Sequence, residues 1–319
     1  MPGRTCRLDA PAKINLHLEV EDRRADGYHN LISIFLAVSF GDTLVIEENG
    51  AGGTTAITME RETGLSGGDD LAALPPEKNL VFRAVELFRE KTRYNRDLAI
   101  RLIKRVPAGG GLGGGSSDAA AVLRALNVLA GAGYGRDDLA ALSACLGSDV
   151  PFFMYGGAAL VTGRGEIMRP LDVPAPLCFV MVTPRFGSST ARAFALLDAA
   201  RGRAGGNAGY GDAGYGDGPR AHHGDYLARA LGAEPSSWPF YNDFLPVLAG
   251  EQDGIYPRMM GELHAAGAAF TGLSGSGSSC FGVFPPGTAA RRAAARLKKH
   301  GFFVQTTIFL ASMPDPMLQ

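Results

Sequence analysis

The stretch from Pro107 to Ala120, PAGGGLGGGSSDAA, contains six glycines among fourteen residues. Glycine reaches positive φ angles and leaves no side chain between the main-chain amides and a ligand. Directly after the stretch, Val122, Leu123, Leu126 and Leu129 have the spacing of one face of a helix. Several amides and the positive end of a helix dipole would therefore point at one place, which predicts an anion site, most often for a polyphosphate.

This glycine loop does not match the two commonest phosphate-binding motifs. No lysine follows the glycines, as a Walker A motif requires. The spacing Gly109-x-Gly111-x-x-Gly114 satisfies the dinucleotide pattern, but about a hundred residues precede it, whereas a Rossmann loop follows the first strand of its unit. A flexible hinge would need neither a strand before it nor a helix after it. We expect Ser116 or Ser117 to cap the helix, with a hydroxyl available to a phosphate or its metal.

Strands and helices on both sides of the loop must hold it in place. Alternating apolar and polar residues predict a strand over 98–106, which runs straight into the loop. Similar patterns predict strands over 5–20, 31–40, 43–46, 178–182, 279–284 and 302–309, and helices over 79–91, 137–146, 255–267 and 288–300. Residues 49–76 are expected to be mostly loop around one short strand candidate. This mixture indicates an α+β fold.

Three prolines between residues 169 and 176 mark a change in composition. We place a domain boundary there, which gives an N-terminal domain of residues 1–172 and a C-terminal domain of residues 173–319. Residues 201–224 are glycine-rich, and such a segment buries too little apolar surface to order itself well. We interpret it as a surface insertion without chemistry, and we expect its neighbouring residues His222 and His223 to be solvent-exposed rather than metal ligands.

The composition excludes several functional classes. The 319 residues include 32 acidic and 31 basic ones, so we expect no binding to nucleic acid or to a membrane surface through general charge. The four cysteines are far apart, which argues against a zinc site or a disulfide framework and favours the cytoplasm: Cys6, Cys145, Cys178 and Cys280. We find no signal-peptide pattern and no membrane span. Monomer and homodimer both stay open.

Three motifs together resemble the GHMP kinase superfamily. The glycine loop is similar to its ATP loop, PAKINLHLEV (Pro11–Val20) to its N-terminal motif, and TGLSGSGSSCFGVF (Thr271–Phe284) to its C-terminal motif. The resemblance implies a two-domain GHMP kinase fold, with an N-terminal domain like ribosomal protein S5 domain 2 and a ferredoxin-like C-terminal domain. It also implies ATP and Mg²⁺ as cofactors, and the residues that bind Mg²⁺ stay open.

The same resemblance assigns the residues that bind ATP. Asn79 would lie near the adenine, although this position is equally typical of a helix N-terminus. The remaining ATP-binding residues implied are those of the loop: Pro107, Ala108, Gly109, Gly110, Gly111, Leu112, Gly113, Gly114, Gly115, Ser116 and Ser117.

Three further segments resemble one branch of this superfamily: RRADGYHNLISIF (Arg23–Phe35), GSDVPFF (Gly147–Phe153) and YNDFLPV (Tyr241–Val247). This implies phosphorylation of the 2-hydroxyl of a small-molecule substrate, cytidine diphosphate-linked methylerythritol, in non-mevalonate isoprenoid biosynthesis. One alternative is another GHMP kinase, of the homoserine or mevalonate type. The other is a catalytically silent, nucleotide-binding regulator, which could have lost Lys13 or Asp149, and both are present.

The resemblance implies that Lys13 and Asp149 face each other across the transferred phosphate. Taken alone, Lys13 is typical of an exposed strand face and Asp149 of a turn or cap. As a pair they suit phosphoryl transfer, which depends mainly on positioning and on neutralising charge. Asp149 can accept the proton of the attacking hydroxyl or orient that hydroxyl, while Lys13 keeps Asp149 ionised.

Aromatic residues are expected to hold the cytosine of the substrate. Under the resemblance, Tyr28 stacks on the base and His29 hydrogen-bonds its edge, since every base offers a π-face to an aromatic ring. We expect Phe194 to be the second aromatic side chain against the base, with Phe186 as its rival.

Four further residues are expected to contact the substrate. Asn15 lies two residues after Lys13 and so shares its strand face. We expect Thr190 to contact the substrate directly. Gly275 and Gly277, in the second glycine-rich loop, would let the main chain approach the diphosphate.

Overall fold

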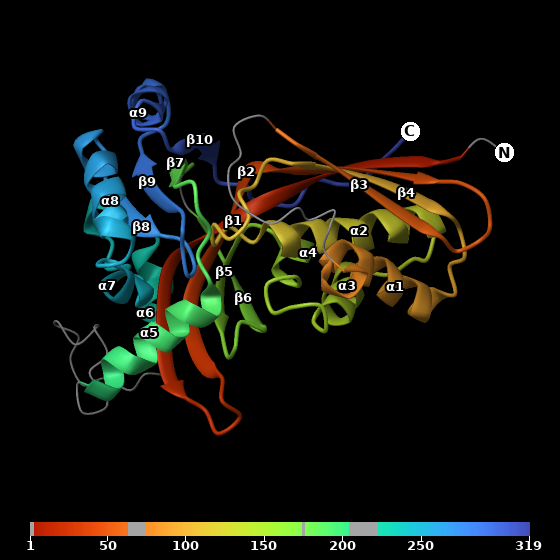
Figure 1. Cartoon of the computed structure of the whole chain (residues 1–319), viewed down its shortest axis with the longest axis horizontal. Coiled ribbons are helices and arrows are strands. Elements are labelled where there is room, and N and C mark those ends of the chain that lie inside the picture. The colour runs from red at the N-terminus through yellow and green to blue at the C-terminus, as the bar shows by residue number, and fades with distance from the viewer. Residues whose placement is uncertain (1–2, 63–74, 174–175, 204–222) are drawn as a thin grey trace.

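The computed structural model describes residues 3–62, 75–173, 176–203 and 223–319. Its larger sheet has the strand order β11-β1-β2-β4-β3, and β5 and β6 extend it from β2 (Figure 1). The strands of this sheet are β1 (Thr5–Arg23), β2 (His29–Glu48), β3 (Thr55–Arg61), β4 (Leu98–Lys104), β5 (Ala158–Thr162), β6 (Ile167–Leu171) and β11 (Met317–Leu318). The long hairpin of β1 and β2 reaches from this sheet towards the second one.

The second sheet is antiparallel and has the order β10-β7-β9-β8. Its strands are β7 (Cys178–Thr183), β8 (Phe270–Leu273), β9 (Cys280–Phe284) and β10 (Phe303–Ile308). The helices of this part are α5 (Thr190–Arg203), α6 (His223–Ala230), α7 (Phe244–Leu248), α8 (Ile255–Ala265) and α9 (Thr288–Lys298). Helices separate β7 from β8 and β9 from β10, so this is the β-α-β-β-α-β arrangement of the expected ferredoxin-like fold.

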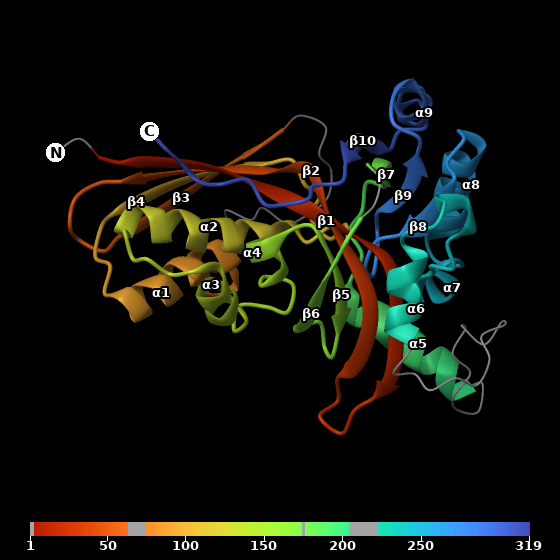
Figure 2. The ribbon, with the colours of Figure 1, turned by 180° about the vertical axis from the view of Figure 1, so that it is seen from behind.

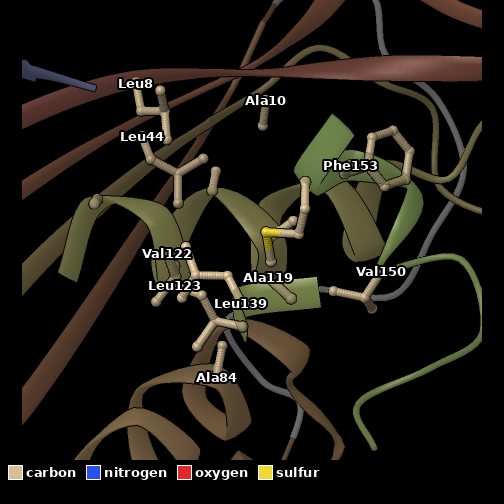
Figure 3. Packing of buried hydrophobic residues seen from close by; sticks show 14 of the residues in the cluster. Leu8, Ala10, Leu44, Ala84, Ala119, Val122, Leu123, Leu139, Val150 and Phe153 are labelled. Atoms are coloured by element: carbon tan, nitrogen blue, oxygen red, sulfur yellow. The ribbon is translucent and has the colours of Figure 1, made fainter. Parts of the chain in front are cut away.

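One face of the larger sheet is covered by helices α1 (Leu80–Thr92), α2 (Gly114–Ala130), α3 (Arg136–Ser143) and α4 (Phe152–Tyr155) (Figures 1 and 2). Helix α2 lies at the centre of this layer. Figure 3 shows Ala119, Val122 and Leu123 of α2 between Leu8 of the sheet and Leu139 of α3. Because α2 is packed on several sides, the glycine loop at its start is fixed at that end.

Most predicted elements are confirmed, but the prediction of two strands over 31–40 and 43–46 is wrong. They form the single strand β2, in which Gly41 pairs with Pro11 of β1. A side chain at Gly41 would clash with the carbonyl oxygen of Ala10. Glycine therefore serves close strand packing here, and Asp42 beside it is buried inside the sheet rather than placed in a turn.

The division of the strands between the two sheets agrees with a two-part fold. Strands β1 to β6 form the larger sheet and β7 to β10 the second one, and the C-terminal strand β11 returns to pair with β1. The boundary between residues 172 and 173 stays a prediction. No helix among the described residues reaches the length and hydropathy of a membrane span.

Candidate active site

Glycines set the shape of the loop between β4 and α2. The φ values of Gly109, Gly111 and Gly113 are 67°, 73° and 71°, in the left-handed region that favours glycine. Gly113 is the N-cap of α2, and no side chain caps this helix, so the predicted capping by Ser116 or Ser117 is wrong. The Ser117 hydroxyl instead donates to the carbonyl oxygen of Pro11 at 2.6 Å. A left-handed cap needs glycine, which explains why no serine occupies the position.

The carbonyl groups from Gly109 to Leu112 are bound by other segments. Gly109 accepts from the amides of Ser188 (2.9 Å) and Ser278 (3.1 Å). The other three acceptors are Gly110 O, bound by Ser279 N, Gly111 O, bound by the Ser274 hydroxyl, and Leu112 O, bound by Lys13 N. A carbonyl and the following amide point in opposite directions across a trans peptide. The amides from Gly110 to Gly113 therefore point away from these donors, and among the described residues they have no protein acceptor.

The loop walls a cavity of about 340 Å³, here called the loop cavity. It is lined by every loop residue from Pro107 to Ser116, and also by Asn79, Leu80 and Lys104, whereas Ser117 is buried outside this lining. The Asn79 side chain accepts from Val81 N at 3.0 Å and caps α1. Asn79 therefore marks the start of a helix, as one interpretation expected, and it also borders the cavity where the other would place the adenine.

A second cavity of about 270 Å³, here called the Lys13 cavity, adjoins the loop cavity. Both cavities are lined by Gly111 and Gly113. Besides these two glycines, six predicted site residues line the Lys13 cavity: Lys13, Asn15, Asp149, Thr190, Phe194 and Gly275. The rest of its lining is Leu18, Leu31, Phe35, Phe244 and Ser276. Segments far apart in the sequence thus meet beside the glycine loop.

Lys13 and Asp149 form an ion pair at this meeting point. Lys13 Nζ lies 3.3 Å from Asp149 Oδ2 and donates to Asn15 Oδ1 at 2.6 Å. The ammonium also lies 4.2 Å from the centre of the Phe35 ring. The Lys13 side chain is only 5% exposed, so it does not lie on an exposed strand face. A buried ammonium needs such partners, because an unpaired buried charge is very costly.

His29 and Phe194 lie side by side next to this cavity. Their rings stack with centroids 5.3 Å apart. His29 Nδ1 is 2.8 Å from Glu21 O, and Nε2 is 3.1 Å from Asp198 Oδ1. The rival Phe186 is partly buried against the same hydrophobic cluster as Phe194, but it does not line the Lys13 cavity.

Besides His29, two predicted substrate residues do not line the Lys13 cavity, namely Tyr28 and Gly277. Tyr28 is 58% exposed at the turn between β1 and β2, with Arg164 4.9 Å from its ring centre. Gly277 donates its amide to Ser274 O and lies near the Tyr256 ring. By contrast, the Thr190 hydroxyl is 2.8 Å from the Ser276 hydroxyl at the cavity wall.

Sequence reasoning missed a buried charged cluster beneath the glycine loop. Lys104 Nζ contacts Asp42 Oδ2 and lies 2.7 Å from Asp118 Oδ2. Asp42 Oδ1 also accepts from the amides of Arg105 (2.5 Å) and Val106 (2.8 Å), directly before the loop. The cluster therefore ties the end of β4 to the first turns of α2. The sequence signal that could have revealed this cluster is the alternation of apolar and polar residues in β4. Lys104 occupies the next position on the face of Leu98, Ile100 and Leu102, which is the buried face.

Burial shifts the pKa values in this cluster. Burial raises the pKa of the Asp118 carboxyl to about 8; the Lys104 ammonium opposes this rise and the Asp42 carboxylate adds to it. Burial lowers the pKa of Lys104, but attraction to Asp118 and Asp42 outweighs it and holds this pKa above its ordinary value. Two carboxylates sharing one ammonium thus favour a proton on Asp118.

His223 is not solvent-exposed as expected, whereas His222 lies outside the described residues. The side chains of His17, Glu19 and His223 offer ligand atoms within 4.8 Å of one another. However, the Tyr241 amide donates to His17 Nδ1 at 3.3 Å, which leaves the proton of a neutral ring on Nε2, facing Glu19. A protonated nitrogen has no lone pair for a metal. We therefore interpret the three residues as a polar cluster that links β1 to α6.

Two family models match the chain. The model of the GHMP kinases N terminal domain matches residues 79–157, and that of the GHMP kinases C terminal matches residues 238–302. A curated relative from Anaeromyxobacter dehalogenans, named 4-diphosphocytidyl-2-C-methyl-D-erythritol kinase, is 39% identical over 91% of this chain and 84% of its own length. A relative of the same name from Rhodococcus jostii is 35% identical over 96% of this chain and 92% of its own length. In Mycolicibacterium gilvum, the match is 43% identical but spans only 63% of this chain and 60% of the relative.

Solved structures also share this architecture. A crystal structure of 4-(cytidine 5'-diphospho)-2C-methyl-D-erythritol kinase is 32% identical and has a TM-score of 0.74, covering 95% of this chain and 99% of that one. The crystal structure of a homoserine kinase from Cytophaga hutchinsonii is 21% identical with a TM-score of 0.69, and the match covers 99% of this chain and 97% of that one. This likeness concerns the fold alone.

Proposed function

This chain belongs to the GHMP kinases, and among them to the 4-diphosphocytidyl-2-C-methyl-D-erythritol kinase family. We therefore propose that it phosphorylates 4-diphosphocytidyl-2-C-methyl-D-erythritol. It transfers the γ-phosphoryl group of ATP to the 2-hydroxyl of 4-diphosphocytidyl-2-C-methyl-D-erythritol in the non-mevalonate route to isoprenoids. The observation that carries this proposal is the Lys13–Asp149 pair, 3.3 Å apart, where the loop cavity meets the Lys13 cavity.

The glycine loop supports ATP as the phosphoryl donor. Its amides from Gly110 to Gly113 have no acceptor among the described residues, and the start of α2 adds the positive end of a helix dipole. An added side chain at Gly113 would meet Phe153 at 2.9 Å and Lys13 at 3.0 Å. The bare main chain thus lets the terminal phosphate come close to the Lys13 ammonium.

We propose Mg²⁺ together with ATP. Mg²⁺ is held largely by phosphate oxygens and water, with few protein ligands, and it neutralises charge on the β- and γ-phosphates. Ser116, in the first turn of α2, lines the loop cavity. Its hydroxyl oxygen is of the ligand type that Mg²⁺ prefers, so the cavity wall fits the ion.

Asp149 and Lys13 would act on the attacking hydroxyl and on the transferred group. Asp149 is partly exposed, at 32% of its side chain, so an incoming alcohol can reach its carboxylate. The carboxylate orients the alcohol and takes its proton as the phosphoryl group transfers. The Lys13 ammonium, fixed by Asn15 and Phe35, stabilises negative charge on the phosphoryl group.

The cytidine end of the substrate would lie towards Phe194 and His29. The stacked pair of rings beside the Lys13 cavity supports Phe194 over Phe186 as the partner of the base. Thr190 and Gly275, on the cavity wall, would then meet the diphosphate. All of these substrate roles stay predictions, and the lining of the Lys13 cavity supports neither Tyr28 nor Gly277.

The alternatives are less well supported. The homoserine kinase structure is only 21% identical, below the identity of the relatives that share the proposed substrate in their names. The paired Lys13 and Asp149 argue against a catalytically silent regulator. We also propose the cytoplasm as the location, because the four cysteines are free, as is usual under reducing conditions.

Release of ADP tests this function directly. The purified chain is incubated with ATP and Mg²⁺, with and without the cytidylated methylerythritol, and ADP is measured by a coupled assay. We expect ADP to form only with the acceptor, and the phosphate to appear on its 2-hydroxyl by ³¹P NMR. Equal turnover with homoserine or mevalonate, or no acceptor-dependent ADP, would remove the proposal.

A further inference from the structure

Asp198 presents its carboxylate to the imidazole of His29 beside the Lys13 cavity. Asp198 Oδ1 is 3.1 Å from His29 Nε2. Phe194, four residues earlier on α5, stacks on the same imidazole with a 21° angle between the planes. Residues four apart share one face of a helix. One face of α5 therefore offers an aromatic ring and a carboxylate at the place proposed for the base.

Helix α5 is firmly attached at this place. It runs beside the hairpin of β1 and β2 (Figures 1 and 2). Arg201, on the same helix, donates to Val20 O at 2.6 Å and pairs with Asp243 at 3.1 Å. Asp243 in turn accepts from Val20 N at 2.8 Å. Asp198 thus comes from a docked helix, although its side chain is 36% exposed and can be reached by a ligand.

The hydrogen bonds of His29 determine what its second nitrogen can do. Nδ1 is 2.8 Å from Glu21 O, and a carbonyl oxygen only accepts, so Nδ1 carries the proton. In the neutral ring Nε2 then has a lone pair, and it faces the Asp198 carboxylate, which is also an acceptor. Two acceptors this close need hydrogen between them. A second proton on the imidazole supplies it, and so does a ligand group with two N–H bonds.

We propose that Asp198 and His29 together bind the exocyclic amino group of the cytosine, and that Asp198 sets the preference for cytosine over uracil. The inference rests on the proposed function, which brings a cytidine to this site. The cytosine amino group carries two N–H donors, one for His29 Nε2 and one for Asp198 Oδ1. Uracil has a carbonyl oxygen at that position, which would face two acceptors. Phe194 supplies a stacking surface that accepts either base.

Binding of nucleoside diphosphates to the full chain tests this role without catalysis. Calorimetry with cytidine diphosphate and with uridine diphosphate, each with the loop cavity saturated by a non-hydrolysable ATP analogue, gives the ratio of the two affinities. We expect the wild type to bind cytidine diphosphate at least about ten-fold more tightly, within the range of one well-formed paired contact to a base. Equal affinities in the wild type would overturn the proposal.

The Asp198→Asn variant gives the sharper result. An asparagine amide has both a donor and an acceptor, so it can donate to uracil where the carboxylate cannot. We expect the preference for cytidine diphosphate to fall at least about five-fold, with tighter binding of uridine diphosphate than in the wild type and an unchanged unfolding temperature. Asp198→Ala should lose cytidine diphosphate affinity without this gain. An unchanged ratio in Asp198→Asn would overturn the proposal.

A matched control uses another carboxylate that pairs with α5. Glu251 lies 2.6 Å from Arg192 of α5 and does not line the Lys13 cavity. Glu251→Gln should leave the ratio of the two affinities unchanged, and an equal shift in both variants would refute a specific role of Asp198. The ADP assay with the cytidylated acceptor tests the proposed function separately, so failure of one can be told from failure of the other.

Discussion

At the scale of single residues, the proposed catalytic role of the Lys13–Asp149 pair can be tested by substitution. We predict that Asp149→Asn lowers the turnover number by a factor of about 10² to 10⁴, the range typical for loss of a general base. The ATP affinity should stay within a few fold, because the proposed phosphate ligands are the loop amides and not Asp149. Steady-state kinetics and a separate titration with an ATP analogue measure both quantities. Near-normal turnover would show that Asp149 does not take the proton.

Asp118 makes the stability of the fold depend on pH. Since its pKa is raised to about 8 in the folded chain, its contribution is fully present below its unfolded pKa, about 4, and is lost as the pH rises through 8. We predict that Asp118→Asn removes this loss. The free energy of unfolding of the wild type relative to the variant should fall, by roughly 1–3 kcal/mol between pH 5 and 9.

Urea unfolding across this pH range measures the effect of Asp118. Asp225→Asn is the matched control, because Asp225 forms an exposed pair with Arg169 and should add little pH dependence. A wild type and an Asp118→Asn variant with parallel pH profiles would contradict the assignment of the raised pKa.

Sequence motifs predicted the residues with local signals and missed those defined by long-range contacts. The glycine loop, Lys13 and Asp149 belong to recognisable patterns, and five further predicted residues line one of the two cavities with them: Asn15, Asn79, Thr190, Phe194 and Gly275. The hydroxyl of Ser274 and the carboxylate of Asp198 matter only through partners more than a hundred residues away. No local pattern contains that information.

At the scale of elements, the main chain of the glycine loop lies directly against another loop. A side chain at Gly111, whose φ is 73°, would clash with the carbonyl oxygen of Ser274. We predict that Gly111→Ala weakens binding of an ATP analogue at least about ten-fold, since both the strain and the clash displace the amides. Fluorescence or calorimetric titration measures this affinity.

Gly131→Ala is the control for backbone strain alone. Gly131 ends α2 with a φ of 60°, and an added side chain there would have nothing within 4 Å. This variant should lose some stability but keep its affinity for the ATP analogue. If both variants bound the analogue equally, the close approach to Ser274 would not matter for the loop.

Elements with regular apolar patterns were predictable, and those held by polar or long-range contacts were not. The pattern gave α1, α2 and β4 close to their observed bounds. Helix α5 was missed because its apolar stripe is short. Only Ala193 and Leu197 of this helix are fully buried, and the contacts of Asp198 and Arg201 with the hairpin are long-range polar ones. The short strands β5 and β6 owe their conformation to pairing with β2 and with each other, which a local pattern cannot reveal.

At the scale of the whole molecule, the two sheets are joined through the glycine loop. Ser188, Ser278 and Ser279, from the second part, donate to its carbonyls. We predict one cooperative calorimetric transition for the whole chain. An ATP analogue at about 100 times its dissociation constant should add about 2.7 kcal/mol to the free energy of unfolding of the entire molecule. Two separate transitions, with only one shifted by the analogue, would show that the parts unfold independently.

The segment from Ser274 to Ser279 borders both proposed ligand sites. Gly275 and Ser276 line the Lys13 cavity, proposed for the alcohol, and the amides of Ser278 and Ser279 donate to carbonyls of the glycine loop, proposed for the triphosphate. If binding of one ligand shifts this hexapeptide, the shift would change the site of the other ligand. Such energetic linkage is reciprocal: if the cytidylated alcohol tightens the hold on nucleotide by some factor, nucleotide must tighten the hold on the alcohol by that same factor.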